Sequence, residues 1–370
     1  MNPRPRVVTI GGGTGHYTLL SGLRSFDVDL TAIVTMMDSG GSSGRLRDDY
    51  GVLPPGDFTR CLVALSSAPD ATKELFSHRF ARGSLEGHTI RNLLFTALSE
   101  ITGDPARTVG LLHDLFAVRG AVLPVTIDRV ELVAHLENDR VLRGEASIDG
   151  VGGMLDAPVL SVYLDPPATA FPPALEAIAR ADLIIIGPGD LYTSLVPNLL
   201  VEGVREAICA SPAKVLYVCN LMTKVNETPG YSVGDFIGTL GLYLGQARLD
   251  AVLYNVAWPT TRLGDYAGEG SVPVGCDPSR APEGLLEPHD LLAEGTFIRH
   301  DPKKLAEAIA TVARTRGWWP PNSLRPRALP PRDRTTQNRG QATANRRCRR
   351  ATGRGSPGSF VEVGVCRAQA

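Results

Sequence analysis

The sequence lacks long hydrophobic runs, although 43% of its 370 residues are hydrophobic. No apolar stretch approaches the ~18 residues that a membrane-spanning helix needs. The N-terminal segment passes from polar residues straight into a strand-like run, Val7–Ile10, without the apolar region typical of a signal peptide. We therefore expect a cytoplasmic protein with a substantial core and no membrane contact.

Paired cysteines are also absent. The six cysteines are scattered, and none is spaced as a Cys-x-x-Cys pair or with histidines at zinc-ligand spacing. Such cysteines in a reducing compartment usually pack as small hydrophobic residues, so the sequence predicts neither a zinc site nor a disulfide framework. No nucleophile elbow, Ser-His-Asp order or carboxylate pair is recognisable from spacing, so the catalytic residues stay unknown.

Lysine is missing from residues 318–370, which contain 11 arginines and only two acidic residues. Subtracting these from the totals of 38 basic and 39 acidic residues leaves 27 and 37 in residues 1–317, a net charge of −10. We expect no nucleic-acid binding by this acidic folded domain. The aperiodic Arg/Pro-rich tail is predicted to be disordered. It is either a basic arm for an acidic partner or, as its abrupt composition favours, a non-native terminus.

Short β-branched strands alternate with amphipathic helices throughout residues 1–317. This rhythm predicts an α/β fold, a three-layer αβα Rossmann-like sheet that is mostly parallel. Between residues 121 and 165 a run of shorter strands predicts a small β-rich insert. Strands are expected at Val7–Ile10, Leu30–Thr35, Leu183–Ile186, Val215–Cys219 and Ala251–Tyr254, with Val122–Ile127, Val130–Leu136, Val141–Ile148 and Pro158–Leu164 in the insert. Helices are expected after caps at Asp57 and Asp301 and over residues 88–101.

A first glycine cluster follows the first strand and precedes a helix. It consists of Gly11, Gly12, Gly13, Thr14 and Gly15. The spacing matches neither the dinucleotide fingerprint nor a Walker A loop. Glycines before a helix N-terminus let the backbone approach a phosphate closely, so we interpret the cluster as a phosphate loop. A tight turn without a ligand is the alternative.

A second cluster follows the next strand and contains Gly40, Gly41, Ser42 and Ser43. Successive small residues can form a nest of backbone N–H groups that binds an anion. Asp38, which precedes the cluster at the carboxyl end of the strand, is a candidate for holding a phosphate-bound Mg²⁺ or for accepting a ribose hydroxyl. The alternative is a flexible loop, but two such loops on consecutive strands favour ligand binding.

A third cluster, Gly187–Ser194, follows another apolar strand. Gly187 and Gly189 predict a turn in which Asp190 is either a helix cap or a ligand contact. Tyr192 is a candidate for stacking on a base or sugar, and Thr193 and Ser194 are candidates for phosphate contacts. Weaker candidates for the same site are His88, Asn92 and Asn220.

At these loops the sequence resembles the bacterial gluconeogenesis-factor (YvcK-like) proteins, relatives of the 2-phospho-L-lactate transferases (CofD-like) that build a deazaflavin coenzyme. The resemblance covers about residues 6–315. It rests on Ile10–Gly15, Ser39–Arg47, Leu53–Asp57, Gly87–His88 with Asn92, and Gly187–Ser194, which places Asp57, His88 and Asn92 among the ligand-binding residues. Two positions depart from the family's pattern, because Ser39 replaces a second acid and Arg91 replaces a second glycine.

The resemblance implies a Rossmann-like protein that binds a UDP-sugar and is required for growth and cell shape under gluconeogenic conditions. The alternative that it implies is a Mg²⁺-dependent 2-phospho-L-lactate transferase-like enzyme that acts on a nucleoside-diphosphate-linked substrate, with the metal on Asp38. Ser39 weakens the metal role, and Arg91 either fills space that a substrate needs or adds a phosphate contact. Whether the chain is an enzyme, whether it forms a homo-oligomer and which partner proteins it has are left open.

Overall fold

The computed structural model describes residues 4–150, 153–245, 248–258, 263–268, 270–295 and 297–319. Its centre is a seven-stranded sheet in the order β10-β9-β8-β7-β1-β2-β3, and every neighbouring pair is parallel. The strands are β1 (Arg6–Gly11), β2 (Asp29–Val34), β3 (Ala121–Pro124), β7 (Leu183–Ile186), β8 (Lys214–Val218), β9 (Ala251–Asn255) and β10 (Leu286–His289). The predicted α/β class with a parallel sheet is confirmed.

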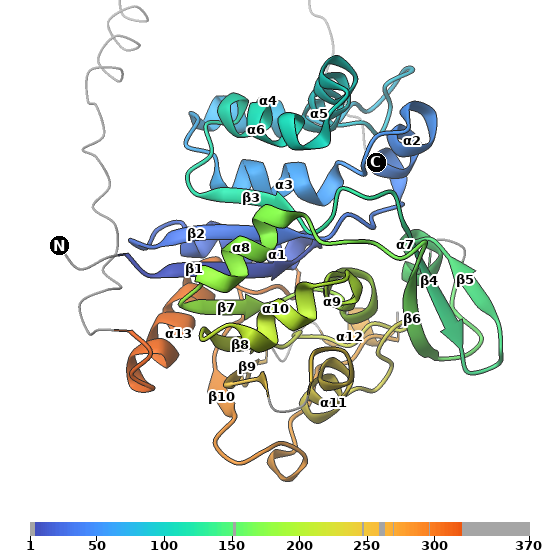
Figure 1. The fold of residues 1–370 in the computed structure, drawn as a ribbon. Coiled ribbons are helices and arrows are strands. Elements are labelled where there is room, and N and C mark those ends of the chain that lie inside the picture. The colour runs from blue at the N-terminus through green and yellow to red at the C-terminus, as the bar shows by residue number, and fades with distance from the viewer. Residues whose placement is uncertain are drawn as a thin grey trace, which may run out of the picture. The chain divides into compact units, whose positions relative to one another are not determined.

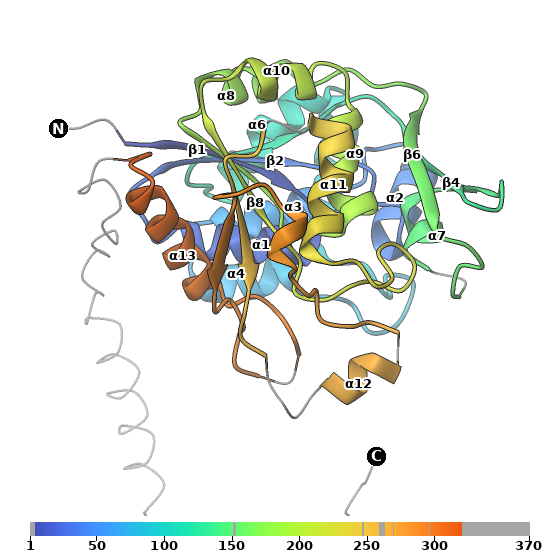
Figure 2. The same ribbon diagram turned by 90° about the horizontal axis from the view of Figure 1, so that it is seen from below.

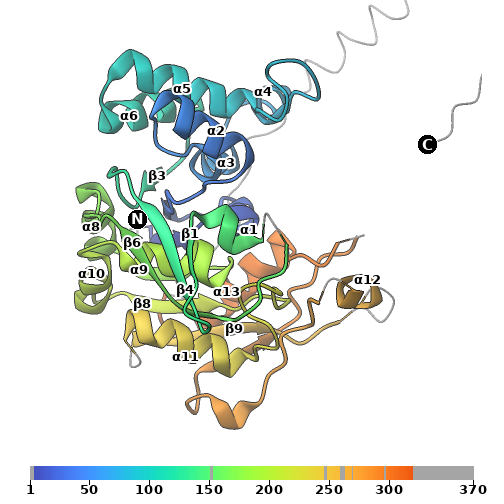
Figure 3. The same cartoon turned by 90° about the vertical axis from the view of Figure 1, so that its right-hand side faces the viewer.

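Helices cover both faces of this sheet, as Figures 1 and 2 show. One face carries α1 (Gly13–Leu23), α3 (Gly56–Leu65) and α13 (Pro302–Thr315); the other carries α8 (Pro172–Arg180), α9 (Val196–Leu200), α10 (Val204–Ala210) and α11 (Val233–Leu244). The two layers lie on opposite sides of the strands in the view of Figure 3. Because both faces are covered, the central strand β7 is apolar along its whole length, and all four of its residues are buried.

Four more helices extend the molecule beyond the β3 edge (Figure 1). They are α2 (Gly41–Tyr50), α4 (Asp70–Ser77), α5 (Ile90–Thr102) and α6 (Pro105–Leu115). Other helical segments of the described ranges are the π-helical turn η1 (Leu191–Leu195), α12 (Leu263–Gly268) and the 3-10 turn η3 (Pro278–Arg280). None of the helices in the described ranges is both long and apolar enough to cross a membrane.

The predicted insert is smaller than expected. An antiparallel sheet in the order β5-β4-β6 is formed by β4 (Glu131–Leu136), β5 (Val141–Arg143) and β6 (Val159–Asp165). The first predicted insert strand, Val122–Ile127, was assigned wrongly, because it pairs in parallel with β2 as β3. The end of the strand predicted at Val141–Ile148 is also wrong: Gly144 turns the chain with a φ of 83°, and helix α7 (Glu145–Asp149) follows.

The predicted helix caps had different outcomes. Asp301 caps α13 by accepting the N–H of Lys304 at 2.8 Å, as predicted. Asp57 does not cap α3, since it lies inside the first turn, after Pro55. The helix predicted from residue 88 begins at Ile90 behind the cap Thr89.

The C-terminal boundary also differs from the prediction. Trp318 and Trp319 belong to the predicted tail, yet both pack against the core that α13 completes. Trp319 is buried, and the Arg316 guanidinium lies 5.7 Å from the ring centre of Trp318. The rest of the predicted tail lies outside the described residues.

Candidate functional site

The first and third glycine loops meet at the point where the order of the strands reverses, between β1 and β7. After β1 the chain adds β2 and β3 on one side, and later β7 to β10 on the other, so β1 and β7 are neighbours. Open α/β sheets bind ligands at the carboxyl ends of strands at such a point. A Cβ atom on Gly12 would lie 2.8 Å from Asp57 Oδ2 and 3.6 Å from Ser194 Cβ. The structure therefore brings these two loops and the start of α3 together.

The second glycine cluster is not the loop that was predicted. Gly41–Gly44 form the first turn of α2, in which the N–H of Gly44 donates to the carbonyl of Gly40 at 3.0 Å. The N-cap residue of this helix, Gly40, has no side chain to cap it, and the same holds for Gly12 before α1, which begins at Gly13 in the first cluster. Uncapped helix N-termini carry free N–H groups and the positive end of the helix dipole, so both clusters offer anion-binding ends.

Asp57 connects the N-termini of these two helices. Its carboxylate accepts the N–H of Gly13 at 2.7 Å, where a phosphate oxygen is expected. A Cβ atom on the preceding residue, Gly56, would collide with Ser43 of the second cluster and with Asp38, which precedes that cluster. Burial and the nearby Asp38 carboxylate raise the pKa of Asp57 to about 6, against the opposing effect of Arg60.

A chain of hydrogen bonds holds α2 against α3 and α5. The Ser42 hydroxyl lies 2.9 Å from His88 Nδ1, and the Asn92 amide donates to the same hydroxyl at 3.1 Å. Thr59 in turn donates to the Asn92 carbonyl oxygen at 2.8 Å. Burial and the charge of Arg45 lower the pKa of His88. The structure thus joins His88 and Asn92 to the second cluster, where they position Ser42.

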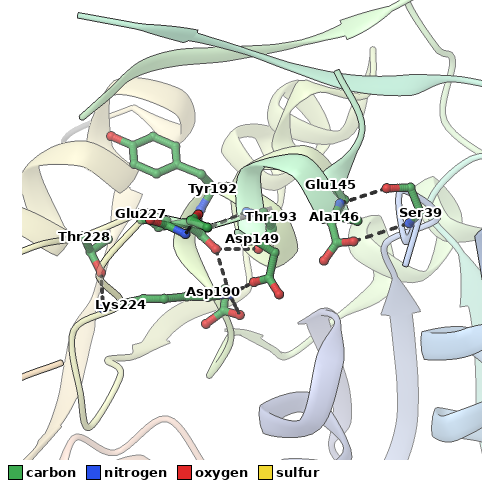
Figure 4. A network of polar contacts seen from close by, with 12 residues as sticks. Ser39, Glu145, Ala146, Asp149, Asp190, Tyr192, Thr193, Lys224, Glu227 and Thr228 are labelled. Carbon is green, nitrogen blue, oxygen red and sulfur yellow. Dashed lines mark hydrogen bonds and ion pairs between the residues drawn. The ribbon is translucent and has the colours of Figure 1, made fainter. Parts of the chain in front are cut away.

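Ser39 connects the second cluster to the small sheet. Its hydroxyl accepts the N–H of Ala146 at 2.9 Å, and its own N–H points to the Glu145 carboxylate at 3.4 Å (Figure 4). Burial and the Asp38 charge raise the pKa of Glu145 to about 7. Glu145 was missed in the sequence, because it lay at the end of a predicted strand with no motif around it.

The third loop is held by a residue that sequence reasoning also missed. Glu227 is 2% exposed and accepts the N–H groups of Tyr192 and Thr193 at 2.8 and 3.2 Å, and the Thr193 hydroxyl at 2.8 Å. Tyr192 is itself buried, with its hydroxyl 3.2 Å from that of Tyr231. In the third loop Ser194 therefore lies next to the first cluster, whereas the side chains of Tyr192 and Thr193 contact Tyr231 and Glu227 instead.

The Lys224 side chain pairs with a cluster of three carboxylates beside this loop. Its ammonium pairs with Asp190 at 2.7 Å, with Glu227 at 3.1 Å and with Asp149, as Figure 4 shows. Oxygens of the three carboxylates lie within 4.8 Å of one another, which is a spacing suited to a metal ion. The lysine supplies the positive charge there. Asp190 occupies the N-cap position of η1, as one of its two predicted roles requires, but its side chain makes no capping hydrogen bond; burial with the Glu227 charge raises its pKa.

Two further features lie apart from the loops. Asn220 follows β8, one strand beyond β7, and its Oδ1 is buried without a hydrogen bond among the described residues. A cavity of about 180 Å³ lies between the end of α2, α5 and α6, and Phe95, Glu100 and Arg129 are in its lining. None of the lining residues belongs to the three clusters.

Comparison with known proteins identifies the family. The family model for 2-phospho-L-lactate transferase CofD matches residues 7–288. A Nostoc sp. relative is 46% identical over 82% of this chain and 68% of its own length. The Bacillus subtilis protein named gluconeogenesis factor is 39% identical over 84% of this chain and 99% of its own. The chain belongs to the gluconeogenesis-factor family of the CofD superfamily.

A solved structure supports the same assignment for the fold. A Bacillus halodurans protein, described as a member of the upf0052 family, superposes with a TM-score of 0.79. It is 39% identical, and the match covers 84% of this chain and 100% of that one. In this gluconeogenesis-factor family member, the two departures from the family's pattern both lie at the site: Ser39 caps α7, and Arg91 lies buried in the first turn of α5.

The raised pKa of Glu145 leads to a testable pH dependence. The folded-state pKa of about 7 exceeds the usual 4.5, so the protonated form stabilises the fold and this contribution is lost as pH rises from 4.5 through 7. We expect Glu145→Gln to stabilise the protein by up to about 3 kcal/mol at pH 8 and by less than about 1 kcal/mol at pH 5. Melting temperatures at both pH values measure this difference.

Glu137→Gln is the matched control, because Glu137 is exposed. It should change the melting temperature little at either pH. If Glu145→Gln fails to stabilise the protein at pH 8, the Glu145 carboxylate does not carry the buried charge assigned to it.

Proposed function

We propose that this gluconeogenesis-factor family member binds a sugar nucleotide, such as a UDP-sugar, and acts in the cytoplasm as a factor required for growth and cell shape under gluconeogenic conditions. The observation that carries the proposal is that two helix N-termini without a capping side chain on their own N-cap residues, those of α1 and α2, both contact the first turn of α3. Two adjacent anion-binding ends suit a diphosphate. The family assignment supports the physiological part.

The charges around these helix ends suit the two parts of such a ligand. Arginines gather on the side of α2, α3 and α5, and carboxylates on the side of β2, α7 and the third loop. A diphosphate is stabilised by guanidinium groups, and sugar hydroxyls donate hydrogen bonds to carboxylates. The cations are Arg45, Arg60, Arg79 and Arg91, and the carboxylates are Asp38, Glu145 and Asp190.

A second function, a Mg²⁺-dependent 2-phospho-L-lactate transferase-like activity, is favoured by the match to the CofD family model and by Asp38. Carboxylate oxygens are the donors that Mg²⁺ prefers, and Asp38 raises the pKa of both Asp57 and Glu145, which is a repulsion that a cation relieves. Asp38 would hold the ion, with one oxygen already accepting the Gly40 N–H at 3.0 Å. The ion would supply positive charge to the diphosphate of the substrate, whose P–O–P bond breaks when the phospholactyl group is transferred and a nucleoside monophosphate leaves.

A thermal-shift panel of UDP-sugars and GDP, with and without Mg²⁺, tests both functions. A ligand at 100 times its Kd stabilises the protein by about 2.7 kcal/mol, which raises the melting temperature by several degrees. The sugar-nucleotide factor should respond to a UDP-sugar equally in EDTA and in Mg²⁺. The transferase should respond more strongly with Mg²⁺ and lose that gain in Asp38→Asn. If none of these nucleotides raises the melting temperature, both proposals fail.

A further inference from the structure

Arg91 is a buried cation that has no partner in the described part of the chain. It lies in the first turn of α5 and is 8% exposed. Its Nε atom has no hydrogen bond, and within the described residues no ion pair involves its guanidinium. Burial and the charges of Arg60 and Arg79 lower its pKa to about 10. A desolvated guanidinium beside other cations is unfavourable unless an anion joins it.

The neighbouring arginines are already engaged. Arg45 donates to the carbonyl of Glu86 at 2.6 Å, and Arg79 donates to the carbonyl of Gly87. Arg60 donates to the Thr14 hydroxyl at 3.1 Å and lies 3.8 Å from Asp57. Arg91 is therefore the one of the four whose guanidinium makes no hydrogen bond or ion pair in the described part of the chain.

Arg91 on α5 adjoins Asn92, which accepts a hydrogen bond from Thr59 on α3. The residue after Thr59, Arg60, reaches the start of α1. Arg60 contacts Thr14 in the first turn of that helix, and Arg91 lies in the electrostatic field of Arg60, of Asp57 and of Tyr17, which is also on α1. Asp57 holds the N–H of Gly13, and the remaining N–H groups of the first turn of α1 lie at the same place. The two terminal nitrogens of the Arg91 guanidinium also make no hydrogen bond among the described residues, and a guanidinium can bind two oxygens of a phosphate side by side.

We propose that Arg91, together with Arg60 and the first N–H groups of α1, forms an anion subsite that holds one phosphate group without a metal ion. The subsite deepens the proposed function and rests on it: Arg91 supplies at this position the charge that a cation would otherwise supply to a diphosphate. Inorganic pyrophosphate presents the same chemistry without the sugar or the base, so it is the probe of this subsite.

Calorimetric titration of the full chain with pyrophosphate in EDTA tests the subsite. Arg91→Ala should weaken binding by at least tenfold, and Arg91→Lys should recover part of the loss, because a lysine keeps the charge without the paired donors. Arg107→Ala is the matched control, since Arg107 is an exposed arginine in the first turn of α6. It should leave the affinity within about twofold of the unsubstituted protein.

The melting temperature separates a ligand role from a structural one. Arg91→Ala should leave the ligand-free protein as stable as before or more stable, because it removes an unpaired buried charge. The added stability from pyrophosphate should fall in this variant. An affinity within twofold of the unsubstituted protein, or a destabilised ligand-free Arg91→Ala protein that still binds pyrophosphate, would overturn the subsite.

A parallel titration with a UDP-sugar and with GDP distinguishes failure of the subsite from failure of the proposed function. Nucleotide binding that is equal in the unsubstituted protein and in Arg91→Ala overturns the subsite and leaves the proposed function standing. Pyrophosphate binding that depends on Arg91, with no nucleotide bound, supports the subsite and overturns the proposed function. Absence of binding by any of the three ligands overturns both.

Discussion

Replacing Glu227 by alanine should lower the free energy of unfolding by about 3–5 kcal/mol, which corresponds to a fall of about 10 °C in melting temperature. The side chain is buried and accepts three hydrogen bonds from Tyr192 and Thr193, so its removal leaves two buried N–H groups and a hydroxyl unpaired. It also leaves Lys224 without one of its carboxylate partners. Chemical denaturation followed by circular dichroism measures the change.

The matched control is Glu137→Ala, in which an exposed glutamate is removed at a cost of about 0.5 kcal/mol or less. Glu227→Gln should have an intermediate effect, because its amide oxygen can still accept from the loop but carries no charge for Lys224. A cost for Glu227→Ala as small as that of the control would mean that Glu227 does not hold the third loop.

Gly12→Ala should reduce sugar-nucleotide affinity by at least tenfold. The added Cβ would lie 2.8 Å from Asp57 Oδ2 and would collide with the Thr35 methyl group, so the first loop or Asp57 must shift. A shift of Asp57 breaks its hydrogen bond to Gly13 and moves the start of α1 relative to α3. Overpacking of this kind costs about 1–3 kcal/mol of stability in addition. Calorimetric titration and thermal melting measure the two effects.

Gly110→Ala provides the control for this substitution. Gly110 is exposed in α6, and a Cβ atom there would meet no atom within 4 Å. Alanine favours a helix over glycine, so this variant should be slightly more stable and should bind ligand unchanged. If Gly12→Ala behaves as the control does, the first loop does not form part of the binding site.

The fold was predictable where one local pattern determines the structure. The Leu-Ile-Ile-Ile run of β7 and the β-branched run of β1 indicate strands buried on both faces, and alternation with helices indicates parallel pairing. The carboxyl ends of parallel strands lie at one edge of the sheet, and each glycine cluster directly follows a strand. It was therefore predictable that the clusters lie close together. The Asp301 cap was likewise readable from the Asp-Pro pair before an apolar helix.

The rest depended on contacts between residues far apart in the chain. Glu227 holds Thr193 across 34 positions, and nothing around Glu227 in the sequence marks it as buried. Asp57 is a residue type that often caps helices, but its carboxylate instead accepts the N–H of Gly13, 44 positions away. The turn at Gly144 converts the end of an apparent strand into α7, which brings Glu145 to Ser39. Such pairings follow from the packed fold and leave no periodic signal.

The most direct test of the proposed site is amide hydrogen exchange of the full chain with and without a UDP-sugar. Ligand phosphates that bind at the starts of α1 and α2 should protect the N–H groups in peptides that cover residues 11–15 and 40–44. Protection confined to the cavity between α2, α5 and α6, in peptides that cover residues 50–53 and 99–105, would contradict this location. So would a ligand that raises the melting temperature and leaves both glycine clusters unprotected.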